Sequence, residues 1–406
     1  MPDASPSSRS LPSQPGLRPI YLDNHATTRV DPQVVEEMLP FFDVKFGNAA
    51  SVNHRFGWEA AEAVDRARER IAEFVNASAA SILFTSGGTE SNNLAIKGVL
   101  RAAPRASHLI VNAAEHRSVL DPAKKLERQG FPLTILPVDQ AGRVDAGAVA
   151  AALRPETVLV SVMLANNEVG TINPVREVAE ICRNRGVALH CDAVQAVGRI
   201  PVDLAGLGAD LVSFSAHKLY GPKGVGALYI RPEGRATRME PLLDGGGHER
   251  RLRSGTLAVP LIVGFGAACR LAAQNLGDEA PRIAKLRDRL WQRMTDALTG
   301  LTRNGHASER LPGNLNVSFD GVDGEALMNA LTEIAVSSGS ACTTADPEPS
   351  HVLRAMGLSE PRIRASVRFG LGRFTTQAEI DFGADYVAET VLRLRSPRQA
   401  APRARP

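Results

Sequence analysis

The chain has 406 residues, 44% of them hydrophobic, with 47 Lys and Arg against 44 Asp and Glu. This length is ample for a large core and for two domains, and the near balance of charge predicts no nucleic-acid partner. No apolar run approaches the roughly 18 residues that cross a bilayer, so we predict no membrane segment.

The two ends of the chain differ in composition from the rest. Residues 1–19 are rich in Ser and Pro and lack the apolar core of a secretory signal, so we predict a disordered leader. Arg9 and Arg18 favour an organelle-targeting alternative only weakly, and Asp3 counts against it. Residues 396–406, mostly Pro, Ala and Arg, predict a disordered tail.

The four cysteines have no paired spacing; they are Cys182, Cys191, Cys269 and Cys342. They predict neither a disulfide framework nor a CxxC metal site, and the pattern favours a reduced, cytoplasmic protein. The first three lie among apolar residues and are predicted to be small core side chains, whereas Cys342 lies among small polar residues.

Between about Ile82 and Tyr229, short β-branched runs alternate with amphipathic helical segments. The predicted strands are Ile82–Thr85, Leu109–Asn112, Leu133–Pro137, Leu159–Met163, Ala188–Cys191, Leu211–Phe214 and Ala227–Ile230. The predicted helices are Glu90–Arg101, Ser118–Gln129, Asp145–Leu153 and Val175–Arg185. This alternation predicts an α/β fold with a mostly parallel seven-stranded sheet, covered by helices on both faces, that binds ligands at the carboxyl ends of its strands.

After roughly Pro260 the regular alternation of short strands and helices ends. The predicted elements there are helical stretches at Ile262–Leu276 and Arg282–Leu298, strands at Asn314–Phe319 and Ser366–Phe369, and a closing helix at Gln377–Arg393. They predict a smaller α+β domain. We place the large domain at residues 28–275 and the small domain at residues 20–27 and 276–395.

The first functional motif is a glycine turn, Thr85–Asn93, between a predicted strand and a helix. Such a turn offers backbone N–H groups and a positive dipole end to an anion, and Thr89 adds a hydroxyl. It is not a P-loop, and taken alone it is more simply a helix cap than a phosphate site. His116 follows the next strand, where it could stack on a planar ring or move protons, although a single histidine is more often structural.

Two further motifs follow the later strands. Asn166-Asn167-Glu168-Val-Gly170 offers amide groups to oxygen atoms of a cofactor or substrate. Asp192 ends a buried strand and needs a partner, which a protonated pyridine nitrogen would provide, and Gln195 lies one helical turn beyond.

Lys218 stands at the exit of the apolar run that ends in Ser-Phe-Ser215-Ala-His217-Lys218. Ammonium groups are rarely buried and lose charge when they are, which suits an amine that attacks a carbonyl, as in a Schiff base with pyridoxal phosphate. A single Lys at a strand end would more simply be a surface residue. The ordered set of a glycine turn, His116, Asp192 and Lys218 after successive strands favours the cofactor site.

From Tyr21-Leu-Asp-Asn-His-Ala-Thr-Thr28 to about Arg373 the chain resembles the cysteine desulfurases, which are fold-type I pyridoxal-phosphate-dependent transferases related to class-V aminotransferases. The matching blocks are 51–57, 85–93, 115–119, 166–170, 192–195, 213–226, 245–250 and 253–256. Two positions depart from the family pattern, Val194 in place of a hydroxyl residue and Ala216 in place of a glycine, and neither removes a named contact.

The resemblance implies a role for each site residue. It makes Lys218 the Schiff-base lysine and the base for the substrate's α-proton, and Asp192 the partner of the pyridine nitrogen. The remaining roles are His116 for stacking and proton transfer, Asn167 and Gln195 for the ring oxygens, Gly88, Thr89, Ser215 and His217 for the phosphate, and Arg368 for the substrate carboxylate. Thr256 would reach the phosphate of the neighbouring subunit's cofactor, which implies a homodimer.

Cys342 lies in Val336-Ser-Ser-Gly-Ser-Ala-Cys342, followed by a Pro-containing stretch. An accessible cysteine ionises more readily than a buried one, and the block resembles the catalytic loop of the housekeeping, iron–sulfur-cluster type of desulfurase. The start of the chain is also compatible with the nitrogen-fixation type. The resemblance implies that L-cysteine is converted to L-alanine while Cys342 becomes a persulfide. It leaves open a transient role of Cys342 as an iron–sulfur ligand.

Three alternatives compete with this interpretation: a selenocysteine lyase, an aminotransferase that has no use for Cys342, and a non-catalytic relative. The presence of Lys218, Asp192 and Cys342 favours the desulfurase. The persulfide would pass to an iron–sulfur scaffold or another acceptor protein. The short C-terminus lacks the longer acidic and aromatic segment with which such enzymes often meet the scaffold, so docking there is not implied.

Overall fold

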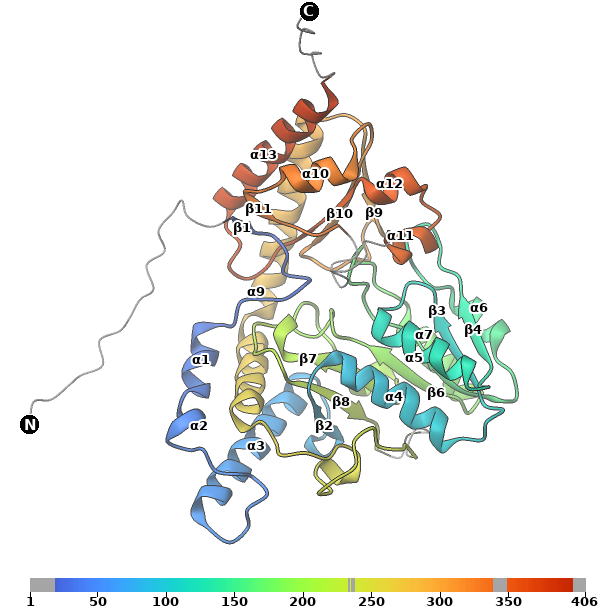
Figure 1. Cartoon of the computed structure of the whole chain (residues 1–406), viewed down its shortest axis with the longest axis vertical. Coiled ribbons are helices and arrows are strands. Elements are labelled where there is room, and N and C mark those ends of the chain that lie inside the picture. The colour runs from blue at the N-terminus through green and yellow to red at the C-terminus, as the bar shows by residue number, and fades with distance from the viewer. Residues whose placement is uncertain (1–18, 233, 235–237, 339–348, 397–406) are drawn as a thin grey trace, which may run out of the picture.

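The computed structural model of this protein describes residues 19–232, 234, 238–338 and 349–396, which form two bodies stacked one above the other (Figure 1). Residues 1–18 of the predicted leader, residues 397–406 of the predicted tail and Cys342 lie outside the described residues. The lower body contains a seven-stranded sheet, and the upper body contains a three-stranded sheet with its own helices.

The seven-stranded sheet has the order β2-β8-β7-β6-β5-β3-β4. Its strands are β2 (Ile82–Thr85), β3 (His108–Asn112), β4 (Leu133–Leu136), β5 (Thr157–Ser161), β6 (Ala188–Asp192), β7 (Leu211–Ser215) and β8 (Gly226–Ile230). Within this sheet β8 is antiparallel to its two neighbours, β2 and β7, and every other pair is parallel, so the predicted, mostly parallel arrangement is confirmed. Every residue of β3, β6 and β7 is buried, as expected for strands covered on both faces.

Alternate residues of the strands enter two different cores. Val212 and Phe214 pack with the layer that contains α3 (Arg55–Phe74) and α7 (Val175–Asn184), whereas Leu211 packs with the layer of α4 (Gly88–Ala102) and α5 (Arg117–Arg128). The predicted helices are confirmed as α4 (Gly88–Ala102), α5 (Arg117–Arg128), α6 (Ala146–Ala152) and α7, with ends shifted by one or two residues. This two-sided packing leaves the carboxyl ends of the parallel strands for the site.

Three helices before the sheet were not predicted: α1 (Pro32–Met38), α2 (Pro40–Asp43) and α3. Their signals were present in the sequence. Asp31 caps α1 by accepting a hydrogen bond from Gln33 N at 3.1 Å, and Pro32 stands at the first helical position. In α3 the buried residues Ala60, Ala63, Val64, Ala67 and Ile71 follow a helical repeat.

The two helical stretches predicted after Pro260 form one helix, α9 (Val259–Ala297), which is 39 residues long. Pro281 removes one backbone hydrogen bond, but the helix continues because its two halves are buried in different cores: Phe265 lies in the lower body and Leu290 in the upper. By length and composition α9 could cross a membrane, contrary to our reading of the sequence, yet 61% of its most apolar window is buried within the protein.

The upper body is built on an antiparallel sheet of order β12-β10-β9. Its strands are β9 (Leu301–Asn304), β10 (Asn314–Phe319) and β12 (Ser366–Gly370), and its helices are α10 (Gly324–Ala330), α11 (His351–Ala355), α12 (Glu360–Arg364) and α13 (Gln377–Arg395). Near the N-terminus, β1 (Ile20–Tyr21) pairs in parallel with β11 (Ile334–Ala335), and Leu22 belongs to the upper core. The described part of the chain therefore passes first through the upper body, at β1, and then enters the lower one.

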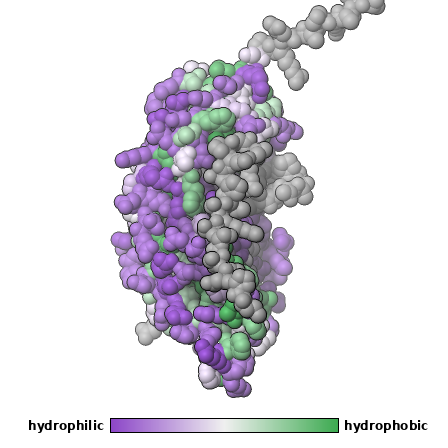
Figure 2. Space-filling model, turned by 90° about the vertical axis from the view of Figure 1, so that its left-hand side faces the viewer, coloured by the Kyte–Doolittle hydropathy of each residue, from purple (hydrophilic) through white to green (hydrophobic). Residues whose placement is uncertain are grey.

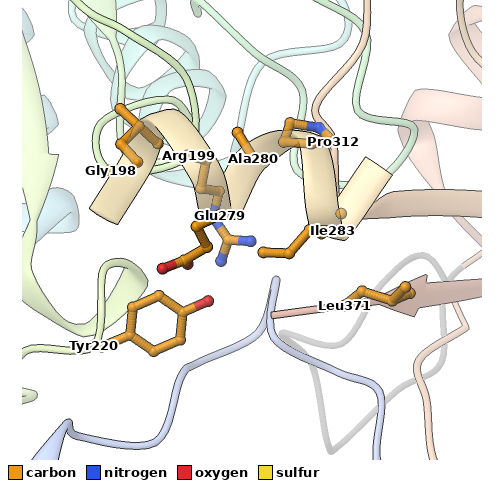
Figure 3. A pocket seen from close by; sticks show the side chains of 10 residues that line it. Gly198, Arg199, Tyr220, Glu279, Ala280, Ile283, Pro312 and Leu371 are labelled. Atoms are coloured by element: carbon orange, nitrogen blue, oxygen red, sulfur yellow. The ribbon is translucent and has the colours of Figure 1, made fainter. Parts of the chain in front are cut away.

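Arg373 ties the two bodies together at their junction. Its guanidinium binds Asp31 and Glu279, each at 2.8 Å, and lies 4.3 Å from the centre of the Tyr220 ring. A small pocket opens beside these groups, and in Figure 3 Glu279 and Tyr220 lie next to the buried guanidinium of Arg199. Tyr220 is two residues after Lys218, so this junction adjoins the segment that follows β7.

Candidate functional site

Lys218 lies at the carboxyl end of β7, in the 3-10 turn Ala216–Lys218 that follows the strand. Its side chain is half-buried, and Nζ donates hydrogen bonds to the backbone oxygens of His25 and Ala26, both at 2.6 Å. These acceptors belong to the segment that leads from β1 to α1. The predicted Schiff-base amine is therefore held between the central sheet and the N-terminal part of the chain.

His25 links Lys218 to Gln195, and we had not predicted it as a site residue. Gln195 donates its Nε2 to the backbone oxygen of His25 at 3.0 Å, and its Oε1 lies 2.9 Å from His25 Nδ1. Burial, followed by the charge of Arg199, lowers the pKa of His25 well below its usual range, so the ring is neutral. Its Nε2 is buried without a hydrogen-bond partner among the described residues. The signal for His25 was its place in the block 21–28.

The predicted anion site forms at the N-terminus of α4. Gly87 has a φ of 152°, and a Cβ on it would lie 3.8 Å from Ser215 Oγ. A Cβ on Gly88 would lie only 2.6 Å from Val194 Cγ2, so glycine allows the turn to approach the segment after β6. Thr89 is exposed in the first turn of α4. The structure thus brings the glycine turn and Ser215 together at a helix N-terminus, which favours an anion.

His217 lies between Ser215 and Lys218 in the turn after β7. Its Nδ1 lies 3.1 Å from Thr27 Oγ1, and its backbone oxygen accepts a hydrogen bond from Thr28 N at 3.0 Å. Burial, with the neighbouring charge of Lys218 as the next cause, lowers the pKa of His217 to about 3. The imidazole is therefore neutral at pH 7, and it can donate an N–H to an anion without adding a positive charge.

Asp192 and His116 belong to one chain of hydrogen bonds. Asp192 ends β6; its Oδ2 accepts from Asn92 Nδ2 at 2.7 Å, and its Oδ1 accepts from Val194 N at 2.9 Å. Asn92 Nδ2 also donates to Ser118 Oγ at 2.8 Å, and Ser118 Oγ lies 2.7 Å from His116 Nδ1. The structure therefore fixes the orientation of the buried carboxylate relative to the imidazole. Asn92 was quoted in the glycine-turn block, but its role was not predicted.

Glu115 is a second buried carboxyl group close to Asp192. One of its oxygens accepts a hydrogen bond from Met163 N at 2.6 Å. Burial raises the pKa of Glu115 well above its usual range, and the charge of Asp192 raises it further. Both effects favour the neutral form of Glu115.

Arg368 lies on β12 and is buried, yet it is paired with only one acid among the described residues. Its Nη1 donates to the backbone oxygen of Asn167 at 2.9 Å, and its Nη2 donates to Asp23 Oδ1 at 2.8 Å. In the part of the chain that the structure describes, neither Arg368 Nε nor Asn167 Oδ1 has a hydrogen-bond partner. Buried polar atoms usually find partners, so a polar ligand would be accommodated here.

The segment 23–26 joins the two halves of this arrangement. Asp23 binds Arg368 at one end, and the backbone oxygens of His25 and Ala26 bind Lys218 at the other. With at most about 3.6 Å per residue, so few residues keep the amine and the guanidinium in one site. Two predicted residues are not joined to it: Cys342 lies outside the described residues, and Thr256 is exposed on the loop before α9.

The Aminotransferase class-V family matches residues 20–382 of this sequence. The chain belongs to that family. It is 54% identical over 378 residues to the cysteine desulfurase IscS of Anaeromyxobacter dehalogenans (strain 2CP-C), covering 93% of both chains. Among solved structures, it resembles a NifS-like protein with a TM-score of 0.86 and 38% identity, covering 93% of this chain and all of the other. It also resembles SspA in complex with cysteine, with a TM-score of 0.78 and 34% identity, covering 88% of this chain and all of the other.

These findings confirm the predicted resemblance, the fold class and the type of enzyme: the chain is a cysteine desulfurase of the class-V aminotransferase family. The residues present also fit the family's cofactor, pyridoxal phosphate. The glycine turn with Ser215 suits a phosphate, the buried Asp192 suits a pyridine nitrogen, and the amine of Lys218 lies at the same edge of the sheet.

Proposed function

We propose that this enzyme removes sulfur from L-cysteine, releases L-alanine and retains the sulfur as a persulfide on Cys342, with pyridoxal phosphate as its cofactor. The observation that carries the proposal is that segment 23–26 places the amine of Lys218 and the guanidinium of Arg368 in one site. An amine for the cofactor's aldehyde and a cation for an amino acid's carboxylate are what a cofactor-dependent reaction of an amino acid requires. The relative solved with cysteine supports the choice of substrate.

The cofactor-binding residues in this proposal are those predicted from the sequence. Asp192 would face the pyridine nitrogen and His116 the ring, while Gly88, Thr89, Ser215 and His217 would hold the phosphate. Asn167 and Gln195 would contact the ring oxygens, although both polar ends of Gln195 are bound to His25 in this structure. When bound, pyridoxal phosphate supplies an electron-poor ring that withdraws electrons from the substrate's α-carbon.

The protein groups then orient the substrate and move its protons. Arg368 would bind the carboxylate through its planar fork of N–H groups, which favours a bidentate contact. Lys218 is the proposed base for the α-proton, because its Nζ already lies at the carboxyl edge of the sheet. His116, hydrogen-bonded through Nδ1 to Ser118, is the second candidate to carry a proton.

The sulfur step balances without an external oxidant. The thiolate of Cys342 attacks the sulfur of L-cysteine, an S–S bond forms, and the bond between the substrate's sulfur and its β-carbon breaks. The electron pair of that bond stays with the carbon, which takes up one proton to become the methyl group of L-alanine. One enzyme thiol and one L-cysteine thus give one enzyme persulfide and one L-alanine.

We further propose that the enzyme is a cytoplasmic homodimer that passes its persulfide sulfur to an iron–sulfur scaffold or another acceptor protein. Apolar side chains are exposed around α2 and the start of α3, and Figure 2 shows apolar groups in the lower half of this face. The most exposed of these residues are Leu39, Phe42, Val44, Phe46, Val52, Phe56 and Trp58. The cysteines among the described residues are buried and form no disulfide there, which agrees with a reducing compartment.

Peptide mass spectrometry tests the proposed reaction. The purified holoenzyme is mixed with L-cysteine in the absence of reductant, and L-alanine is measured in the same sample. We expect one added sulfur on Cys342 and an equal amount of L-alanine. The Cys342→Ala variant should form neither, whereas Cys269→Ala, which removes a buried thiol, should form both. Alanine without modification of Cys342 would instead indicate a reaction of the selenocysteine-lyase type.

A further inference from the structure

Two serines on either side of Cys342 in the sequence donate hydrogen bonds to two carboxylates. One is Asp23, which pairs with Arg368, and the other is Glu168, which follows the residue whose backbone oxygen accepts from Arg368. Ser337 Oγ donates to Asp23 Oδ2 at 2.9 Å, and the other oxygen of Asp23 accepts from Arg368 Nη2 at 2.8 Å. Ser350 Oγ donates to Glu168 Oε2. The described residues on both sides of the Cys342 segment are therefore hydrogen-bonded to carboxylates near the guanidinium of Arg368.

The Ser337 end is fastened by its backbone as well as by its hydroxyl. Arg368 N donates to Ser337 O at 2.7 Å, and Ser337 N donates to Arg368 O at 3.2 Å. Both residues are buried, and this pairing places Ser337 next to β12. A movement of Arg368 would therefore displace Ser337 through the backbone hydrogen bonds and Asp23 through the Ser337 hydroxyl.

The Ser350 end is fastened to the lower body. Ser350 caps α11 by accepting a hydrogen bond from Leu353 N at 3.1 Å, while its hydroxyl proton goes to Glu168. Val352 and Leu353 then pack against Val169, the residue after Glu168. The start of α11 is thus held by one buried hydrogen bond to a carboxylate and by apolar contacts beside it.

The positive charge of Arg368 acts on the pKa of Glu168. It directly follows Asn167, whose backbone oxygen accepts from Arg368 Nη1 at 2.9 Å. Burial raises the pKa of Glu168 to about 7, and the Ser350 hydroxyl, then Arg368, His116 and Arg117, act in the opposite direction. These groups come from α11, β12 and the start of α5, so several elements meet at this carboxylate.

We propose that Asp23 and Glu168 are positioning residues that hold, through Ser337 and Ser350, the two described ends of the Cys342 segment beside Arg368. The inference rests on the proposed function, in which Arg368 binds the substrate's carboxylate and Cys342 attacks its sulfur. One guanidinium then provides a common reference point for the substrate and for the chain that carries the thiol. Fixing both ends of a connecting segment reduces the number of its conformations, which raises the effective concentration of the thiol at the substrate.

The test separates substrate binding from sulfur transfer in a single turnover of the holoenzyme. Rapid mixing with L-cysteine follows binding by the change in cofactor absorbance, and acid quenching with mass spectrometry follows persulfide formation on Cys342. We expect Ser337→Ala and Ser350→Ala each to slow persulfide formation about tenfold, as the loss of a hydrogen bond to a charged group does. Binding should stay within about twofold of the wild type.

Thr376→Ala is the matched control. Thr376 Oγ1 also donates to a glutamate, Glu379 Oε2 at 3.0 Å, and also caps a helix by accepting from Glu379 N at 3.2 Å. It is the N-cap residue of α13 and is exposed. Removing the Thr376 hydroxyl deletes the same kind of hydrogen bonds elsewhere in the upper body. Substrate binding and persulfide formation should therefore both keep their wild-type rates.

Rescue by a conservative change separates positioning from loss of folding. Glu168→Gln keeps an acceptor oxygen for Ser350, so it should recover most of the rate that Glu168→Ala loses. Combining Glu168→Ala with Ser350→Ala should slow the reaction no more than either change alone, because both remove one interaction. Wild-type persulfide formation in the serine variants, or equal slowing of both phases, would overturn the inference. A wild-type enzyme that forms no persulfide would instead overturn the proposed function.

Discussion

Asp23 Oδ1 lies 2.8 Å from Arg368 Nη2, so the proposed carboxylate-binding arginine is already paired with a carboxylate of its own chain. Asp23 does not occupy every N–H donor of the guanidinium, because Arg368 Nε has no hydrogen-bond partner among the described residues. The pair therefore leaves part of the planar fork for a substrate and keeps the buried charge neutralised without it. The four-residue segment that begins with Asp23 also holds Lys218, so substrate and cofactor groups share one support.

Replacing Lys218 should abolish the reaction without unfolding the protein. Lys218→Ala removes the amine proposed to bind the cofactor and to take the α-proton, so the yellow absorbance should be lost and kcat should fall more than about a thousandfold. Absorbance spectra and alanine release check both effects. Lys223→Ala changes an exposed lysine in the following turn and should keep spectrum and rate. A retained cofactor band in Lys218→Ala would place the attachment elsewhere.

Replacing Arg368 by lysine should weaken substrate binding even though the charge is kept. Lysine lacks the planar fork that binds Asp23 and Asn167 together, and it cannot bind a carboxylate in a bidentate manner. We expect kcat/KM for L-cysteine to fall about 10- to 100-fold, mostly through KM. Steady-state kinetics measure this change, and Arg362→Lys on the exposed face of α12 serves as the control. A change confined to kcat would argue against a role in carboxylate binding.

The strands could be predicted closely because each buried run has a β-branched composition and a clear end. Asp192 and Lys218 could be predicted because they follow successive strands together with the glycine turn and His116, although a single Lys at a strand end would more simply be a surface residue. His25 and Asn92 could not, because their roles arise only from partners distant in the sequence: Lys218 and Gln195 for His25, and Asp192 and Ser118 for Asn92. The continuity of α9 through Pro281 was missed because local propensity disfavours it, whereas burial in two cores outweighs that cost.

The pKa of Glu168 predicts a stability difference that depends on pH. A carboxyl group whose pKa is raised from 4.5 to about 7 binds more protons in the folded state, so its contribution to stability is full below pH 4.5 and is lost as the pH rises to 7. Glu168→Gln cannot ionise. Relative to the wild type, it should therefore gain about 1–3 kcal/mol of stability between pH 5 and pH 8. Denaturant unfolding at both pH values measures the difference, and a constant difference would contradict the raised pKa.

The loop before α9 contains three consecutive non-glycine residues with positive φ, and this strain predicts a stabilising substitution. Glu249, Arg250 and Arg251 have φ values of 44°, 58° and 64°. Glu249 is held there by two hydrogen bonds from Arg68, at 2.7 and 2.9 Å, and one from Phe84 N at 2.7 Å, which offset part of the cost. Arg251 is exposed, so glycine could replace it without loss of packing.

Arg251→Gly should therefore raise the free energy of unfolding by about 0.5–1 kcal/mol, because glycine adopts positive φ without a steric penalty. The matched control is Arg128→Gly, which places glycine at an exposed position in the last turn of α5 and should lower the free energy of unfolding by up to about 1 kcal/mol. Denaturant titrations of both variants should thus show shifts of opposite sign. If both substitutions destabilise the protein equally, the loop stores no strain at Arg251, and the entropy that glycine adds to the unfolded chain decides both results.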